Sequence, residues 1–192
     1  MMSRGSWPFL QRIGSAKSRR SHDLSWGPVV SEVHPLDPER LFRTLADHGV
    51  AFVLVGALGA RLYGFPRVTA DADIAPARDR ANLERLAAAL QALDARVFTE
   101  SVPEGLPFDC TATMLAKSEL WNLVTRAGRL DVAFRPAGTE GFTDLSPHAV
   151  RFEVFGVTLA VASLDDIIRS KEAANRPKDR TDVALLKALR PI

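Results

Sequence analysis

From about residue 36, the chain contains apolar runs, alternating apolar and polar positions, and helical patterns. Ala51–Val55 is a continuous apolar run, typical of a strand that is buried on both faces. Val68–Ile74 alternates instead, so Thr69, Asp71 and Asp73 fall on one face of a predicted strand. Further strand patterns predict two β-hairpins, over 121–125 with 129–134 and over 152–155 with 157–161.

Helical patterns fill most of the remaining sequence. Ser101–Asp109 contains two prolines and a glycine and is expected to be a loop. Residues 36–192 are expected to form one domain. The expected helices are Pro38–Asp47, Ala57–Tyr63, Asp79–Leu93, one starting at the capping sequence of Ser163, and, after the interruption at Pro177, Lys178–Leu189.

Residues 1–35 differ from the rest because they are rich in Ser, Gly and Arg and show no sustained periodicity. They predict a basic, flexible N-terminal extension. Residues 1–30 carry a net charge of +4, whereas the whole chain carries +2. The predicted domain is therefore slightly acidic, and its net charge does not mark it as a nucleic-acid-binding protein.

Composition excludes several classes of protein. No apolar run approaches the ~20 residues of a membrane helix, so no membrane partner is expected. The single cysteine, Cys110, rules out an intrachain disulfide and fits the reducing cytoplasm. The four histidines lack the spacing of metal ligands, which makes a zinc site an unattractive hypothesis.

The candidate chemistry lies on the carboxylates. Asp71 and Asp73 are separated by about 6–7 Å along one strand face, and hard cations such as Mg²⁺ prefer such oxygen ligands. Asp131 lies in a later predicted strand, opposite the apolar face of Leu130 and Val132. If its strand neighbours the first, three carboxylates can hold the two-metal arrangement used in phosphoryl chemistry. Alone, an Asp-x-Asp pair also fits a solvated strand end.

Glycine residues precede these carboxylates at the end of the buried strand. Gly56 and Gly59 lie where that strand turns into a helix, and glycine there lets backbone N–H groups approach a phosphate. The same glycines also suit an ordinary strand-to-helix turn. Trp121 has two interpretations as well, since a tryptophan in a strand can stack on a base or fill the core.

Four segments together resemble the AbiE-type (AbiEii and MenT) nucleotidyltransferase toxins of the DNA-polymerase-β-like superfamily. The resemblance covers about residues 38–190. One departure is Ala57, where many members of the superfamily carry a serine that contacts the phosphates. The segments are Val-Gly-Ala-Leu-Gly-Ala-Arg-Leu-Tyr-Gly (55–64), Arg67-x-Thr-x-Asp-x-Asp73, Gly-Arg-Leu-Asp-Val (128–132), and 163–171 followed by Arg-Pro-Lys-Asp-Arg-Thr-Asp (176–182).

The resemblance implies an α+β, polymerase β-like nucleotidyltransferase fold, with a small mixed sheet, packed helices and a helical C-terminal part. It also implies Mg²⁺, an NTP substrate, transfer of nucleotides to the 3′ end of tRNA, a block of aminoacylation and translation, and a cognate antitoxin. Asp71, Asp73 and Asp131 are the expected metal ligands, Asp131 also the base, Lys171 a phosphate ligand and Asp182 a supporting acid. The expected nucleotide-binding residues are Gly56, Ala57, Arg67, Thr69, Lys171 and Arg176.

Thr69 shares a predicted strand face with the two aspartates, which suggests a regulatory role. A phosphate on its hydroxyl would add up to two negative charges beside them. Two other functions remain open. The same fold can transfer a nucleotide to a small molecule or to a protein, and a fold of this kind can persist as a non-catalytic binding module. Clustered carboxylates argue against the last, because without a cation they repel one another.

Overall fold

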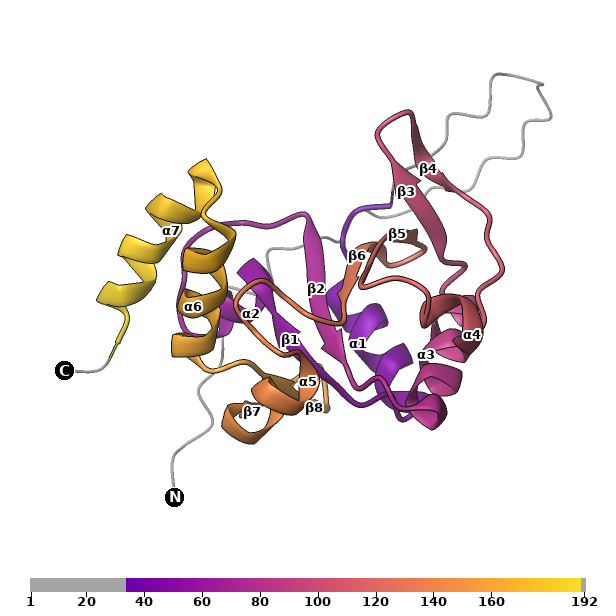
Figure 1. Ribbon diagram of the computed structural model, residues 1–192, viewed down its shortest axis with the longest axis horizontal. Coiled ribbons are helices and arrows are strands. Elements are labelled where there is room, and N and C mark those ends of the chain that lie inside the picture. The colour runs from indigo at the N-terminus through magenta and orange to yellow at the C-terminus, as the bar shows by residue number, and fades with distance from the viewer. Residues whose placement is uncertain (1–33, 191–192) are drawn as a thin grey trace. The chain divides into compact units, whose positions relative to one another are not determined.

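A mixed β-sheet runs through residues 34–190, the part of the chain that the computed structural model describes (Figure 1). Its eight strands are ordered β4-β3-β5-β6-β2-β1-β8-β7. The elements are α1 (Pro38–Asp47), β1 (Phe52–Val55), α2 (Gly56–Leu62), β2 (Asp71–Pro76), α3 (Arg80–Ala92), β3 (Arg96–Thr99), β4 (Val102–Leu106), α4 (Ala112–Leu115), β5 (Leu120–Thr125), β6 (Gly128–Ala133), α5 (Phe142–Leu145), the 3₁₀ helix η2 (Ser146–His148), β7 (Val150–Val154), β8 (Val157–Val161), α6 (Leu164–Ala174) and α7 (Pro177–Ala188).

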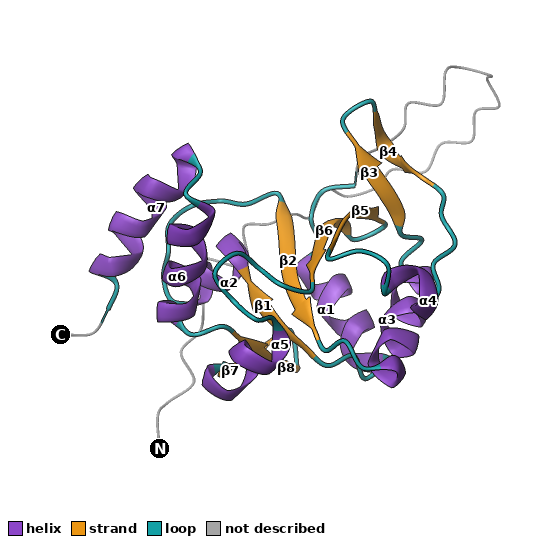
Figure 2. Ribbon diagram, viewed as in Figure 1, coloured by secondary structure: helices purple, strands orange, loops and turns teal. Residues whose placement is uncertain are grey.

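The sheet combines parallel and antiparallel pairs. β2 runs parallel to β6, and β1 parallel to β8, whereas every other neighbouring pair is antiparallel. Strands β3 and β4 project at one edge, and α6 and α7 pack against each other (Figure 2). The parallel pair β2–β6 therefore lies within the sheet, with neighbours on both sides.

β1 is buried on both faces, as its apolar run predicts. Phe52 and Leu54 belong to one hydrophobic cluster, which includes residues of α1 and α3. Val53 and Val55 belong to a second cluster, which includes residues of α6 and α7. Two cores, one on each face of the sheet, thus fix the strand from which the chain enters α2.

Side-chain caps set the helix starts that the sequence predicts. The Asp37 carboxylate accepts a hydrogen bond from the Arg40 N–H, and the Ser163 hydroxyl accepts one from the Asp166 N–H. α6 ends at Asn175, whose φ is 47°, and α7 begins with Pro177, whose missing N–H is no loss at that position. The predicted interruption at Pro177 is confirmed as the junction between α6 and α7.

Two predictions about strands are wrong. The strand expected over Val68–Ile74 begins only at Asp71, so Thr69 lies in the preceding connection. The stretch Ser101–Asp109, expected to be a loop, contains β4, which pairs with β3. Since β4 is the edge strand of the sheet, it tolerates Pro103. The short helices α4 and α5 were not predicted either.

The described part of the chain bears on two further expectations. None of its helices has the length and apolar character needed to cross a membrane. The predicted basic extension, residues 1–35, lies almost entirely outside residues 34–190 and stays a prediction.

Candidate active site

Three carboxylates occupy the parallel pair β2–β6. Asp71 and Asp73 alternate with the buried Ala72 and Ile74, so both aspartates lie on the opposite face from that core. Asp131 is the register partner of Asp73. Neighbouring strands are about 4.8 Å apart, which brings the two residues close together. The prediction that Asp131 lies on a strand beside Asp71 and Asp73 is confirmed.

The carboxylates disfavour one another's charge. Burial, followed by repulsion from Asp71 and Asp131, raises the pKa of Asp73 to about 7, although Lys171 and Arg176 oppose the shift. Burial and then Asp71 also raise the pKa of Asp131. Among the described residues, Asp131 Oδ1 is buried and has no hydrogen-bond partner. The site therefore has an uncompensated demand for positive charge.

Gly56 brings the backbone of the β1–α2 turn against this site. Its φ is +66°, a conformation that other residues rarely adopt, and a Cβ built on it would lie 2.0 Å from Asp73 Oδ2. Both Gly56 and Ala57 line the same cavity as the three aspartates. Both the turn after β1 and the closeness of the Asp73 carboxylate therefore require a glycine at position 56.

Thr69 also contacts the carboxylates, although it precedes β2. Its hydroxyl donates a hydrogen bond to Asp71 Oδ1 and lies 3.3 Å from the Asp71 carbonyl oxygen. The side chain is partly buried at the cavity. The expected position of Thr69 beside Asp71 is thus observed, but a loop and not a strand supplies it.

A network of ion pairs forms the opposite wall. The buried Lys171 ammonium on α6 lies 2.8 Å from Asp182 Oδ2 and 3.3 Å from Asp179 Oδ1, both on α7. Arg67 Nη1 lies 2.8 Å from Asp182 Oδ1, and Arg176 Nε lies 2.7 Å from Asp179 Oδ2. The network ties the connection before β2 to both C-terminal helices. Lys171 and Arg67, predicted to contact phosphates, are here bound to carboxylates, and their role toward a nucleotide stays a prediction.

The two buried acids of this network are held in the charged form. Burial by itself raises the pKa of Asp182, but hydrogen bonds from Lys171 and Arg67 outweigh it, and the pKa is lowered. For Asp179 the opposing bonds come from Arg176 and Lys171, again with a lowered pKa. These carboxylates differ from Asp73 and Asp131 because cations, and not other acids, surround them.

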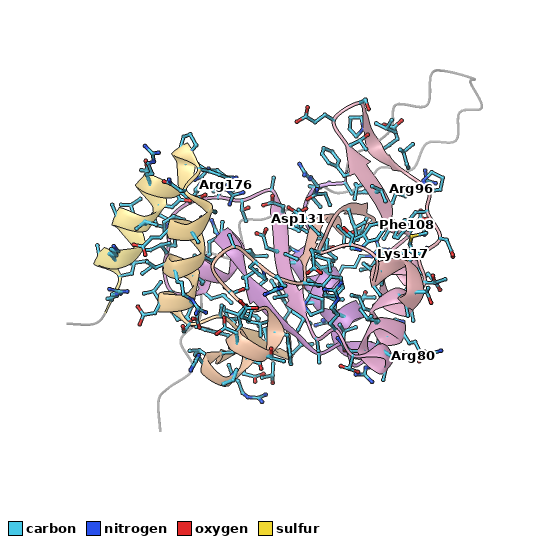
Figure 3. All side chains as sticks on the ribbon, viewed as in Figure 1. Arg80, Arg96, Phe108, Lys117, Asp131 and Arg176 are labelled. Carbon is cyan, nitrogen blue, oxygen red and sulfur yellow. The ribbon has the colours of Figure 1, made fainter. Side chains whose placement is uncertain are left out.

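One cavity of about 660 Å³ unites these groups. The expected metal ligands, Lys171, Asp182 and the expected nucleotide-binding residues all line it. Gly59, which the sequence also suggested for the approach to a phosphate, does not, because it is buried in α2 against Val161. Figure 3 labels two of the cavity's lining residues, Asp131 on the sheet and Arg176 at the junction of α6 and α7. Sequence segments more than 100 residues apart thus converge on a single site.

Trp121 and Arg129 lie on opposite faces of the sheet. Trp121 lies on the opposite face of the sheet from Asp131, where its ring stacks on Phe108 and its indole N–H donates to the Leu115 carbonyl. Of its two interpretations, the core one is right. Arg129, which the sequence reasoning missed, lines the cavity. Its position two residues before Asp131 on the same strand face was the signal that could have identified it.

The donor set fits a hard divalent cation that the substrate helps to bind. Within residues 34–190, no three acidic, histidine or cysteine side chains converge closely enough to hold a metal by themselves. Mg²⁺ sites in enzymes commonly use one or two carboxylates together with substrate phosphates. The unpartnered Asp131 Oδ1 and the raised pKa of Asp73 are the features that a cation would relieve.

No protein-family model matches the sequence, and no curated protein matches it. Among solved structures, the chain is similar to the lincosamide antibiotic adenylyltransferase LnuA in its lincomycin-bound crystal structure. The TM-score is 0.53 at 14% sequence identity, and the similarity covers 82% of this chain and 100% of that one.

The fold is that of a nucleotidyltransferase. The mixed sheet with packed helices corresponds to the polymerase β-like type, as predicted. The nucleotidyltransferase fold thus places Asp71, Asp73 and Asp131 together on the sheet, beside the turn at Gly56.

Proposed function

We propose that this protein is a Mg²⁺-dependent nucleotidyltransferase. The observation that carries the proposal is the placement of Asp71, Asp73 and Asp131 on one face of the parallel pair β2–β6, against the Gly56 turn. Residues 34–190 offer these acids a cavity in which the opposite wall is cationic. Acidic metal ligands facing phosphate-binding cations are what transfer from an NTP requires.

The reaction we propose joins an acceptor hydroxyl to the α-phosphorus of the NTP. The new oxygen–phosphorus bond forms as the bond from the α-phosphorus to the bridging oxygen breaks, and pyrophosphate leaves. Asp71, Asp73 and Asp131 would hold Mg²⁺, which supplies Lewis-acid stabilisation of the phosphates. Gly56, Ala57, Arg67, Thr69, Lys171 and Arg176 would hold and orient the nucleotide, with Asp182 keeping Arg67 and Lys171 in place.

Asp131 is the proposed base for the acceptor hydroxyl. Its Oδ1 has no hydrogen-bond partner among the described residues, so it is available to accept the proton. Asp73, its register partner, would remain a ligand.

The acceptor we propose is the 3′ end of tRNA. Support comes from the resemblance to the AbiE-type toxins, whose four characteristic segments all contribute to the one cavity. Transfer there would block aminoacylation and translation, and would make the protein a cytoplasmic toxin with a cognate antitoxin. We propose phosphorylation of Thr69 as the covalent form of inhibition. The phosphate would place negative charge beside the Asp71 carboxylate.

A small-molecule acceptor is the second candidate. LnuA, the structural neighbour, is an antibiotic adenylyltransferase with lincomycin bound. A cavity of about 660 Å³ is within the usual range of small-molecule sites. A protein acceptor is a further variant of the same chemistry.

The test uses purified full-length protein with Mg²⁺ and each α-³²P-labelled NTP in turn. Parallel reactions contain total tRNA, lincomycin with an aminoglycoside mixture, or a protein extract. Label in RNA that disappears with EDTA and in Asp71→Ala and Asp73→Ala supports the tRNA reaction and names the nucleotide. Label in the drug or protein reactions instead would replace the acceptor, and label nowhere would contradict nucleotidyl transfer. Growth arrest on expression that survives in both variants would contradict a catalytic toxin.

A further inference from the structure

The strand order suggests that the NTP and the acceptor of the proposed reaction approach the carboxylates from different sides along the sheet. Gly56 begins α2 directly after β1, Asp73 lies on β2, and Asp131 lies on β6, and these three strands are neighbours in the sheet. An NTP bound between the Gly56 turn and the cations of α6 and α7 would occupy one flank. The acceptor hydroxyl would then reach Asp131 from the other flank, across β6, β5 and β3.

Arg129 stands on that second flank. It shares the strand face of Asp131 and is the register partner of Asp71 in β2 and of Val124 in β5. Its guanidinium carbon lies 3.8 Å from the centre of the Phe98 ring, which β3 supplies. A cation–π contact thus holds the side chain against the ring, next to the cavity.

Charge pairing distinguishes Arg129 from the other arginines of the site. Arg67 and Arg176 both bind buried carboxylates. Arg129, by contrast, contacts the Phe98 ring, its Nε is buried without a hydrogen-bond partner in the described range, and its charge acts on Asp131 from the same strand face. A buried donor left unpaired costs stability, so a purely structural arginine would be expected to find an acceptor.

The neighbouring side chains are suited to a nucleotide. Leu120 lines the cavity on the same strand face and is 49% exposed, although it is apolar. An arginine fork matches the oxygens of a phosphodiester, and single-stranded RNA bases stack on aromatic rings and on guanidinium planes. Trp121 cannot serve in this way because its ring lies on the other face of the sheet.

We propose that Arg129, held on Phe98, binds the last nucleotides of an RNA acceptor. The guanidinium would contact a phosphate of the strand, and the Phe98–Leu120 side would contact a terminal base. The proposal rests on the proposed function, because it assumes that the acceptor hydroxyl is directed at Asp131.

The experiment compares three variants of the full-length protein. Arg129→Gln removes the charge, and Phe98→Leu removes the ring while keeping an apolar side chain. Arg80→Gln is the matched control, since the Arg80 side chain is 90% exposed on α3 and is not among the residues that line the cavity (Figure 3). Thermal unfolding establishes that each variant is folded. RNA binding is measured by fluorescence anisotropy with a short labelled RNA that ends in CCA, without NTP.

Arg129→Gln should raise the Kd for this RNA and the KM for tRNA about tenfold, and should change the KM for the NTP much less. It should also reduce the slope of log K against log salt by about 0.7, because one phosphate contact is lost. Phe98→Leu should weaken binding several-fold without changing that slope. A change in the KM for the NTP as large as the change in the KM for tRNA, or an unchanged Kd for the RNA in Arg129→Gln, would overturn the assignment.

The two readouts separate this proposal from the proposed function. Wild-type protein that binds RNA through Arg129 but transfers no label would overturn the reaction and leave the binding surface standing. Protein that labels tRNA equally well with and without Arg129 would overturn the surface alone. Protein that neither binds nor labels RNA would overturn both.

Discussion

The backbone of Gly56 lies directly against the carboxylate of Asp73, so closely that a Cβ at position 56 would stand 2.0 Å from Asp73 Oδ2. Gly56→Ala should therefore displace Asp73 and lower nucleotidyl transfer at least about tenfold, with a stability loss of about 1–2 kcal/mol from the positive φ. Radiolabel transfer and urea unfolding measure the two effects.

Gly64 provides the matched control for this substitution. Its φ is +94°, but a Cβ there would meet nothing within 4 Å. Gly64→Ala should lose comparable stability and keep its activity. Equal activity losses in both variants would mean that backbone strain, and not the contact with Asp73, explains the first result.

Lys171 is the centre of the buried ion pairs, and its removal should be costly. In Lys171→Met two buried carboxylates lose their ammonium partner, so the free energy of unfolding should fall by about 3–5 kcal/mol. Lys187→Met removes the pair with Glu172, in which both side chains are 49% exposed, and should cost at most about 1 kcal/mol. Similar urea midpoints for the two variants would contradict a stabilising role for the network.

Asp182 should make the fold sensitive to acid. Because its pKa is lowered in the folded protein, its stabilisation is present above the unfolded value of about 3.9 and is lost as pH falls through the folded value. Asp182→Asn should be less stable at neutral pH, and its stability should vary less below about pH 5. If the free energy of unfolding falls by the same amount between about pH 7 and about pH 3 in wild type and variant, this linkage is excluded.

Mg²⁺ binding should depend on pH near neutrality. Asp73, with a pKa of about 7, is largely protonated below neutrality, and a proton competes with the cation for the same oxygen atoms. Mg²⁺ should therefore raise the melting temperature more at about pH 8 than at about pH 6. In Asp73→Asn this difference should shrink, and an unchanged difference would remove Asp73 from the metal site.

Thr69 can be tested by charge substitution. Thr69→Glu puts a negative charge beside Asp71 and should abolish transfer, whereas Thr69→Ser keeps the hydroxyl that bonds to Asp71 and should retain activity. Thr69→Gln controls for size. If the glutamine variant is as inactive as the glutamate variant, side-chain volume and not charge is responsible.

Strand periodicity was sufficient to predict the central part of this site. The apolar run of β1 and the alternation around Asp73 and Asp131 both reflect burial, which is written in local sequence. The start of β2 was misplaced because Val68, although β-branched, is 75% exposed and lies outside the sheet. β4 was missed because its proline and glycine resemble a loop.

The partners of each cation lay beyond prediction from local sequence. The pairing of Lys171 with Asp182 depends on how α6 packs on α7, and the contact of Arg129 with Phe98 depends on which strand follows β5 in the sheet. Sequence spacing placed Asp131 on the correct face but gave no information about the residue across from it. Register is a tertiary property, and it alone makes Asp73 and Asp131 neighbours.

The position of the β3–β4 hairpin at the margin of the sheet has an evolutionary consequence. β4 is an edge strand that pairs only with β3 in the described sheet. The hairpin can therefore be lengthened, shortened or changed in sequence without rebuilding either core. The Gly56 turn and the carboxylates, in contrast, are enclosed by strands on both sides. Under the proposed function, the acceptor preference can therefore change through a peripheral hairpin, while the residues proposed to bind the nucleotide stay as they are.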